Sequence, residues 1–316
     1  MRKAPFFILF LLLVAPSGWT QELILSGGET ESTSTHDKAV RWGLAYQQGL
    51  SEHWAAGLTY INEGHISGHH RDGWEPQIWL RTNVIDRRLS LAAGIGPYFW
   101  FDTESTRSYS FNAHGWGAVA SVAATWYTES RFLYQIRANW IKAVNDFDSV
   151  SITGGIGFQL DKPLTEGPLR KAPVETSNPT GSQLTLFGGE SVLNRFESQP
   201  QLAEAVEYRY GLAPHVDVTG EFFNEGPHRR MGVASQIWAV RSFVSDKLVF
   251  GVGLGPYAAH DPQRGPDGSS TLNGLIGMTA AYDLTDHWVS RFTWNRVITN
   301  YSHDADLFLL GLGYRF

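Results

Sequence analysis

The residues FLLGLGYRF at positions 308–316 and SITGGIGFQL at positions 151–160 share one pattern. In the later stretch, one face of an extended chain carries apolar residues, namely Phe308, Leu310, Leu312, Tyr314 and Phe316. Successive side chains of a β-strand point to opposite faces, so each stretch predicts a strand with one continuous apolar face. Two such strands, half a chain apart, indicate that the chain contains two similar units.

Short motifs recur in the same order in the two halves, which supports a duplication. The matching pairs are GGE at 27–29 and 188–190, NEG at 62–64 and 224–226, QIW at 77–79 and 236–238, and GIGPY at 94–98 with GLGPY at 253–257. Closely spaced aspartates also precede each closing strand. These aspartates are Asp146, Asp148, Asp304 and Asp306.

The first half predicts an all-β fold. Candidate strands lie near 22–31, 38–50, 53–63, 73–84, 88–101, 115–127, 131–144 and 149–160, and the series repeats across 182–316. Short connections (50–52, 85–87, 128–130) alternate with longer polar ones (32–37, 64–72, 102–114). This alternation is typical of antiparallel transmembrane β-barrels with tight turns at one end and long loops at the other.

The chain divides into four predicted segments. Residues 1–20 have the charged, apolar and small-residue order of a signal peptide, and 161–181 form a proline-rich linker. Residues 21–160 and 182–316 then form two tandem eight-stranded barrels. One sixteen-stranded barrel is the alternative, but a stack of small residues on one face of 90–98 suits a narrow, filled interior.

Composition narrows the possible functions. The formal net charge is −6, no basic run suggests nucleic-acid binding, and the absence of cysteine excludes a disulfide framework. The sequence gives no reason to expect a cofactor.

The terminal GLGYRF, the leader and the eight-strand period resemble the small outer-membrane β-barrel proteins of Gram-negative bacteria. The resemblance implies export to the periplasm, cleavage of the signal peptide and insertion into the outer membrane. It also implies contact with lipid and lipopolysaccharide, and recognition of the strand ending at Phe316 by the barrel-assembly machinery. The superfamily includes anchors, adhesins, channels and lipid-modifying enzymes, so it does not define the function.

The densest polar cluster is NEGHISGHHRDG at 62–73. It offers His65, His69, His70 and Asp72 as candidate catalytic residues or metal ligands, because imidazoles beside carboxylates serve both roles. A hydrated rim loop is the favoured interpretation. The second half keeps NEG at 224–226 but has only His228 in the following loop.

Two further sets of residues need an interpretation. A buried network, structural or ligand-binding, is predicted from Glu63, Gln77 and Arg81, and likewise from Glu225, Gln236 and Arg241, because ionised groups inside a filled barrel must be paired. The four aspartates before the closing strands could bridge calcium to lipopolysaccharide phosphates, but solvated loop acids are the favoured interpretation.

Three functions are consistent with these features. The leading hypothesis is a non-enzymatic outer-membrane protein whose extracellular loops engage lipopolysaccharide, exopolysaccharide or a protein partner. The second is an outer-membrane enzyme that modifies lipid or glycan through the His65–His70 loop. The third is a sixteen-stranded, porin-like channel.

Overall fold

The computed structural model describes residues 21–66, 68–105, 109–160, 165–168, 181–243, 247–265 and 268–316. The regular elements in these ranges are sixteen β-strands. The predicted signal peptide and most of the predicted linker lie outside the described residues. Within those ranges, no helix has the length and apolar character needed to cross a bilayer.

The strands of the first unit are β1 (Gln21–Ser32), β2 (Lys38–Gly49), β3 (Trp54–Ile66), β4 (His69–Val84), β5 (Leu89–Ser105), β6 (Ser110–Tyr127), β7 (Phe132–Ala143) and β8 (Ser149–Gln159). Those of the second unit are β9 (Ser182–Leu193), β10 (Gln201–Ala213), β11 (Val216–Asn224), β12 (Met231–Phe243), β13 (Leu248–Asp261), β14 (Ser269–Asp283), β15 (Trp288–Ile298) and β16 (Ala305–Arg315).

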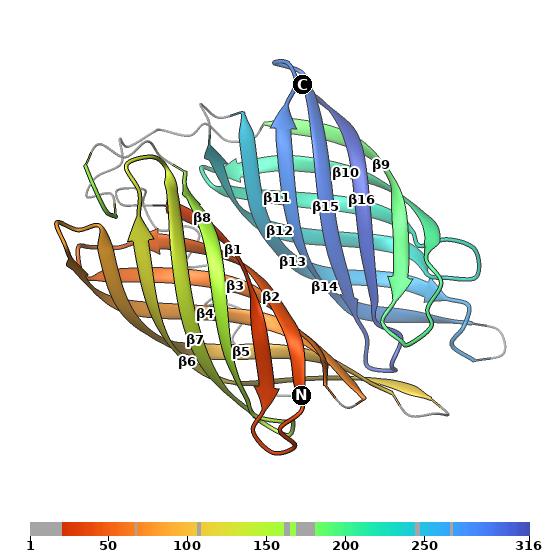
Figure 1. Cartoon of the computed structure of the whole chain (residues 1–316). Helices are drawn as coiled ribbons and strands as arrows, with labels where there is room; N and C mark the ends of the chain where they lie inside the picture. The colour runs from red at the N-terminus through yellow and green to blue at the C-terminus, as the bar shows by residue number, and fades with distance from the viewer. Residues whose placement is uncertain are drawn as a thin grey trace. The chain divides into compact units, whose positions relative to one another are not determined.

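Each unit is a closed antiparallel barrel (Figure 1). In the first, each strand pairs with the next, and β1 pairs back with β8. In the second, β9 pairs with both β10 and β16. The prediction of two eight-stranded units is therefore confirmed. The sixteen-stranded alternative is wrong because β1 and β8 already satisfy each other's hydrogen bonds.

The two faces of the strands differ sharply in polarity. On β5, the side chains of Leu91 and Ile95 are 43% and 67% exposed, whereas Ser90 and Tyr98 on the opposite face are 3% and 0% exposed. Many buried residues are polar or charged, and many exposed ones are large and apolar. The barrels thus place polar groups inside and apolar groups outside, the reverse of a water-soluble core.

Aromatic side chains and glycines fill the interior together. The indole of Trp79 lies so close to Gly94 that a Cβ there would approach the ring to 2.5 Å, and Trp238 lies in the same way over Gly253. An arginine covers each indole, with Arg137 at 5.0 Å from the ring of Trp79. Glycine is required at these positions because the indole of the register partner on the neighbouring strand occupies the space of a side chain.

Three strands of the first barrel exceed their predicted lengths most. Strands β4, β5 and β6 contain 16, 17 and 18 residues, whereas a transmembrane β-strand needs only about 9–11. The predicted loops at 64–72 and 102–114 are largely strand, with pairing that continues to Ile66↔His69 and Ser105↔Ser110. The first barrel therefore extends well beyond a bilayer's thickness at its loop end.

Candidate functional site

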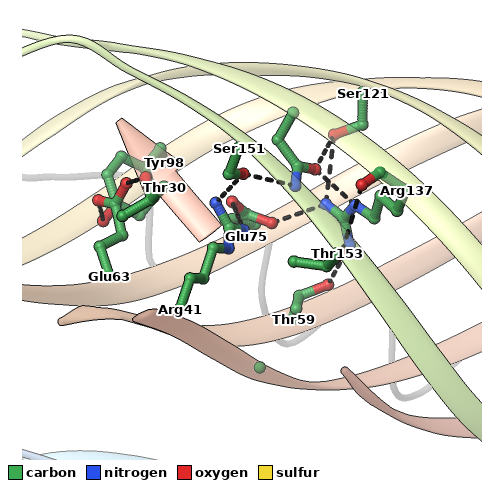
Figure 2. Close-up of polar contacts among 12 residues, drawn as sticks. Thr30, Arg41, Thr59, Glu63, Glu75, Tyr98, Ser121, Arg137, Ser151 and Thr153 are labelled. Carbon is green, nitrogen blue, oxygen red and sulfur yellow. Dashed lines mark hydrogen bonds and ion pairs between the residues drawn. The ribbon is translucent and has the colours of Figure 1, made fainter. Parts of the chain in front are cut away.

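A charged network crosses the interior of the first barrel (Figure 2). Glu75 on β4 is fully buried, and its carboxylate lies between two arginines. Its Oε1 accepts a hydrogen bond from Arg41 Nη2 at 3.1 Å, and its Oε2 accepts one from Arg137 Nη2 at 2.7 Å. Because Arg41 belongs to β2 and Arg137 to β7, the network joins three strands of the barrel wall.

Polar neighbours accept further hydrogen bonds from these arginines. Arg41 donates to Ser151 Oγ at 2.7 Å, and Arg137 donates to Asn139 Oδ1 at 2.6 Å and to Thr59 Oγ1 at 3.1 Å. Figure 2 shows Ser151 and Thr59 beside the two arginines and Glu75. Buried charges are tolerated when they are both paired and hydrogen-bonded. The network therefore fills the interior of the first barrel with side chains that are held in place by hydrogen bonds and ion pairs.

The second barrel has a different charged cluster. Arg209 Nε donates to Glu207 Oε1 at 3.0 Å, and Arg209 Nη1 donates to Asp217 Oδ2 at 3.3 Å. Arg291 lies 3.8 Å from the same Glu207 carboxylate. All four side chains are at most 2% exposed. Charged side chains that pair with one another therefore occupy the interior of the second barrel as well.

The two clusters are not copies of each other. Register and the shared motifs match Arg41 with Ala203 and Glu75 with Ala234. They also match Arg137 with Thr293, through the registers of β8 and β16. The alanines at these second-barrel positions belong to an apolar core cluster. The duplicated barrels therefore fill equivalent interior positions with different chemistry.

A second buried ion pair lies nearer the loop end of the first barrel. Glu63 Oε2 accepts hydrogen bonds from Arg71 Nε at 2.5 Å and from Tyr98 Oη at 2.9 Å. Its Oε1 accepts one from Ser149 Oγ at 2.5 Å. Arg71 also donates to the backbone carbonyl of Phe147 in the β7–β8 connection. This arginine thereby ties β3 and β4 to a loop on the other side of the opening.

The same arrangement recurs in the second barrel. Glu225 accepts hydrogen bonds from Arg230 Nε at 2.8 Å and Nη2 at 2.9 Å. Arg230 Nη1 donates to the backbone carbonyl of His303, two residues before β16, as Phe147 lies two before β8. Tyr257 occupies the place of Tyr98 in the shared GxGPY motif. The repeated glutamate–arginine pair therefore cross-links the loop end of each barrel, which we call its mouth.

The predicted network of Glu63, Gln77 and Arg81 needs correction. Gln77 pairs in register with Gly57, six residues along β3 from Glu63, which corresponds to about 20 Å at the rise of a strand. Gln77 donates to Ser121, and Arg81 donates to the backbone carbonyls of residues 51 and 52. All three are buried, but the charge partner of Glu63 is Arg71.

In the second barrel, Gln236 and Arg241 are buried, with 2% and 3% exposure. Register matches Arg81 with Val240, since the backbone amides of these residues donate to the carbonyls of His53 and His215. Arg241 is therefore not the structural equivalent of Arg81. The partner of Glu225 is Arg230, not Arg241.

The four residues predicted from the histidine cluster do not form one site. His65 and His70 face each other across β3 and β4, with 3.0 Å between Nε2 and Nδ1. His69 is adjacent to His70 on β4, and adjacent side chains of a strand point to opposite faces. Its Nδ1 lies 2.5 Å from Asp102 Oδ2 instead. Asp72 is buried, with 3% exposure.

His69 belongs to a group that the sequence did not reveal. The ligand atoms of His69, Asp102 and Asp146 all lie within 4.8 Å of one another. Burial and the nearby Asp146 raise the pKa of Asp102 to about 6, against the opposing effect of His69. Burial acts to lower the pKa of His69, but the hydrogen bond and charge of Asp102 outweigh it and raise that pKa. Counted from the tight-turn end, Asp102 is the 14th residue of β5 and His69 the 16th of β4, beyond the length needed to span a bilayer.

The four aspartates before the closing strands make different contacts and do not form one site. Asp148 Oδ1 accepts the backbone amide of Ala143, and Asp304 Oδ1 accepts that of Thr299, in each case five residues earlier. Asp148 thus matches Asp304, which shifts the predicted alignment by two residues. Asp306 pairs with Arg296 at 2.8 Å. Asp146 lies 3.4 Å from Arg71.

The sequence matches no family model and no curated protein. Solved structures to which the chain is similar include the N-terminal β-barrel domain of Pseudomonas aeruginosa OprF, at 13% identity over 45% of this chain and 98% of that domain, with a TM-score of 0.37. Another is Ail, the attachment invasion locus protein of Yersinia pestis, at 11% identity over 45% of this chain and 99% of Ail, with a TM-score of 0.35. The translocator domain of the autotransporter NalP from Neisseria meningitidis covers 98% of this chain with 92% of its own length, at 12% identity and a TM-score of 0.22.

Proposed function

We propose that this chain is a non-enzymatic outer-membrane protein that crosses the membrane with two filled β-barrels and engages envelope or surface molecules through its extracellular loops. The observation that carries this proposal is the reversed polarity of the barrels. An apolar exterior around a polar interior is unstable in water but suits hydrocarbon, where backbone hydrogen bonds are closed within the barrel.

Aromatic residues support placement in a membrane. Trp126, Phe132 and Tyr134 are 40%, 50% and 52% exposed near the tight-turn end of the first barrel. Trp116 and Trp140 are 60% and 52% exposed further along the same strands, towards the loop end. Rings at two levels fit the girdles that amphipathic aromatics form at the two membrane interfaces.

The filled interiors favour a role for the loops over transport. The Glu75 network and the Glu207 cluster place paired charges and aromatic rings where a pore would need open space. The extended strands β4, β5 and β6 carry polar residues beyond the bilayer, where they can meet lipopolysaccharide, exopolysaccharide or a protein. In planar bilayers, we expect no stable conductance from the purified chain, and a steady open-channel current would favour the transport hypothesis.

Replacing Ile95 with arginine tests the membrane-facing assignment. Ile95 lies in the middle of the apolar part of β5 and is 67% exposed. A charge at the bilayer midplane destabilises an outer-membrane barrel by about 2–4 kcal/mol. We therefore expect Ile95→Arg to lower the free energy of unfolding by this amount in lipid vesicles, as measured by urea titration.

Tyr109→Arg is the matched control for this measurement. Tyr109 is 65% exposed but lies at the loop end, just before β6. We expect its replacement to change stability by less than about 1 kcal/mol, because depth in the bilayer sets the penalty. Equal effects of the two substitutions would argue against a membrane around Ile95.

A further inference from the structure

Three side chains meet at the mouth of the first barrel from separate parts of the chain. His69 begins β4, Asp102 lies near the end of β5, and Asp146 lies in the β7–β8 connection. Their ligand atoms lie within 4.8 Å of one another. We propose that these three residues form a binding site for one divalent transition-metal ion, with Zn²⁺ as the representative ion.

The donor set indicates this class of metal. One imidazole nitrogen and two carboxylate oxygens suit Zn²⁺ and its neighbours, whereas Ca²⁺ and Mg²⁺ prefer oxygen ligands alone. Zinc binds such atoms at about 2.0–2.2 Å. The three ligand atoms already lie within 4.8 Å of one another, so small side-chain rotations would bring them around a common centre.

Charge and burial independently favour a cation here. Asp102 is 2% exposed, and its Oδ1 has no hydrogen-bond partner among the described residues. Arg71 lies 3.4 Å from Asp146, but its charge is matched by Glu63. Metal binding requires a neutral His69, and in that form the charges of Glu63, Arg71, Asp102 and Asp146 sum to −1 + 1 − 1 − 1 = −2. A divalent ion would neutralise this charge and use the free oxygen of Asp102.

Solvent can reach the site from one side. The side chain of His69 is 33% exposed, whereas that of Asp102 is 1% exposed. A zinc ion held by three protein ligands keeps a fourth position for water. The ring of His69 also packs against Phe147 at 5.5 Å, which fixes the direction of its nitrogen atoms.

The second barrel provides an internal comparison. Counting from the matching pairs Asp72↔Phe101 and Met231↔His260, His228 and Asp261 correspond in sequence to His69 and Asp102, and His228 lies in the β11–β12 connection. The third position, however, is Ser302 in place of Asp146. Asp261 Oδ2 instead accepts a hydrogen bond from Tyr301 Oη at 2.9 Å and lies 3.3 Å from His303 Nδ1. The site therefore belongs to the first barrel, and we infer one ion per chain.

A bound ion would link β4 and β5 to the β7–β8 connection across the barrel opening. Arg71 already joins the same two regions through the carbonyl of Phe147. The ion would thus add a second tie at the outer end of the first barrel. Its expected consequence is a more rigid mouth in the presence of metal.

Titration calorimetry of the full chain in detergent tests the site directly, with ZnCl₂ as the ligand. We expect one Zn²⁺ per chain. His69→Ala, Asp102→Asn and Asp146→Asn should each weaken binding by at least about tenfold, since even removing an outer-shell partner of a metal ligand has effects of this size. The matched control Asp261→Asn should leave the affinity unchanged. Heat-modifiable migration in gels checks that each variant is folded.

X-ray absorption of the zinc-loaded wild-type chain gives an answer that does not depend on any variant. We expect one imidazole per zinc, with oxygen atoms as the other ligands. Two or more imidazoles per zinc would overturn the proposal and point to His65 and His70. The absence of zinc binding, or unchanged affinity in folded Asp102→Asn and Asp146→Asn, would overturn it as well.

Discussion

Replacing Glu75 with alanine is expected to lower the free energy of unfolding of the first barrel by about 3–5 kcal/mol, the usual effect of removing one partner from a buried ion pair. The substitution leaves Arg41 and Arg137 buried at 2% and 6% exposure without their carboxylate. Urea unfolding of the full chain in detergent, followed by tryptophan fluorescence, measures the effect.

The second barrel supplies the matched control for Glu75→Ala. It has Ala203, Ala234 and Thr293 at the three equivalent positions and closes with them. The triple variant Arg41→Ala, Glu75→Ala, Arg137→Thr removes both stranded charges together with the carboxylate. We expect it to be more stable than Glu75→Ala alone, because buried ion networks can be replaced as a unit at little cost.

These two variants distinguish a charge effect from a packing effect. If the triple variant is less stable than Glu75→Ala, lost side-chain volume rather than unpaired charge dominates the interior. If Glu75→Ala itself changes stability by less than about 1 kcal/mol, as a surface ion pair would, the carboxylate is not buried between the arginines as described.

Replacing Glu63 with alanine is expected to have an effect of similar size, about 3–5 kcal/mol. Glu63 is fully buried and accepts hydrogen bonds from Arg71, Tyr98 and Ser149. Its loss removes the carboxylate nearest to the guanidinium of Arg71 and leaves Asp146, at 3.4 Å, as its remaining charge partner among the described residues. Glu225→Ala should do the same in the second barrel, because Arg230 is held there in an equivalent pair.

Comparison of Glu63→Ala with Glu225→Ala also tests the independence of the two barrels. Limited proteolysis during urea unfolding reports on each half separately. We expect Glu63→Ala to expose cleavage sites within residues 21–160 at lower urea, and Glu225→Ala those within 182–316. A loss of resistance in both halves from either single substitution would contradict the separation of the two sheets.

The strands could be predicted from the sequence wherever one face of the strand contacts lipid and the other faces the barrel interior. Residues 89–101 alternate between lipid-facing and interior side chains, so their period of two is visible. Beyond the bilayer this contrast disappears, as at 64–72 and 102–114, where the paired residues are polar on both faces. The sequence therefore predicts loops for these segments, although their backbones continue the hydrogen-bonded pairing of the strands.

The candidate sites were harder to predict because they depend on register between distant strands. Glu63 and Glu225 were found from the repeat, but their partners Arg71 and Arg230 lie at different sequence distances, eight and five residues later. Arg137 reaches Glu75 from a strand 62 positions away. Asp102 lay in a predicted loop, so its place beside His69 had no signal in a single sequence.

The central claim is that each half closes on itself, and disulfide trapping tests it in the full chain, which has no natural cysteine. Leu25 and Ile156 are register partners on β1 and β8. Both face outward, with 61% and 60% exposure. On mild oxidation of the folded protein, the double variant Leu25→Cys, Ile156→Cys should form an intrachain disulfide in high yield. No disulfide in that variant, together with efficient cross-linking of Leu25→Cys to Leu312→Cys on β16, would mean that the two halves share one sheet.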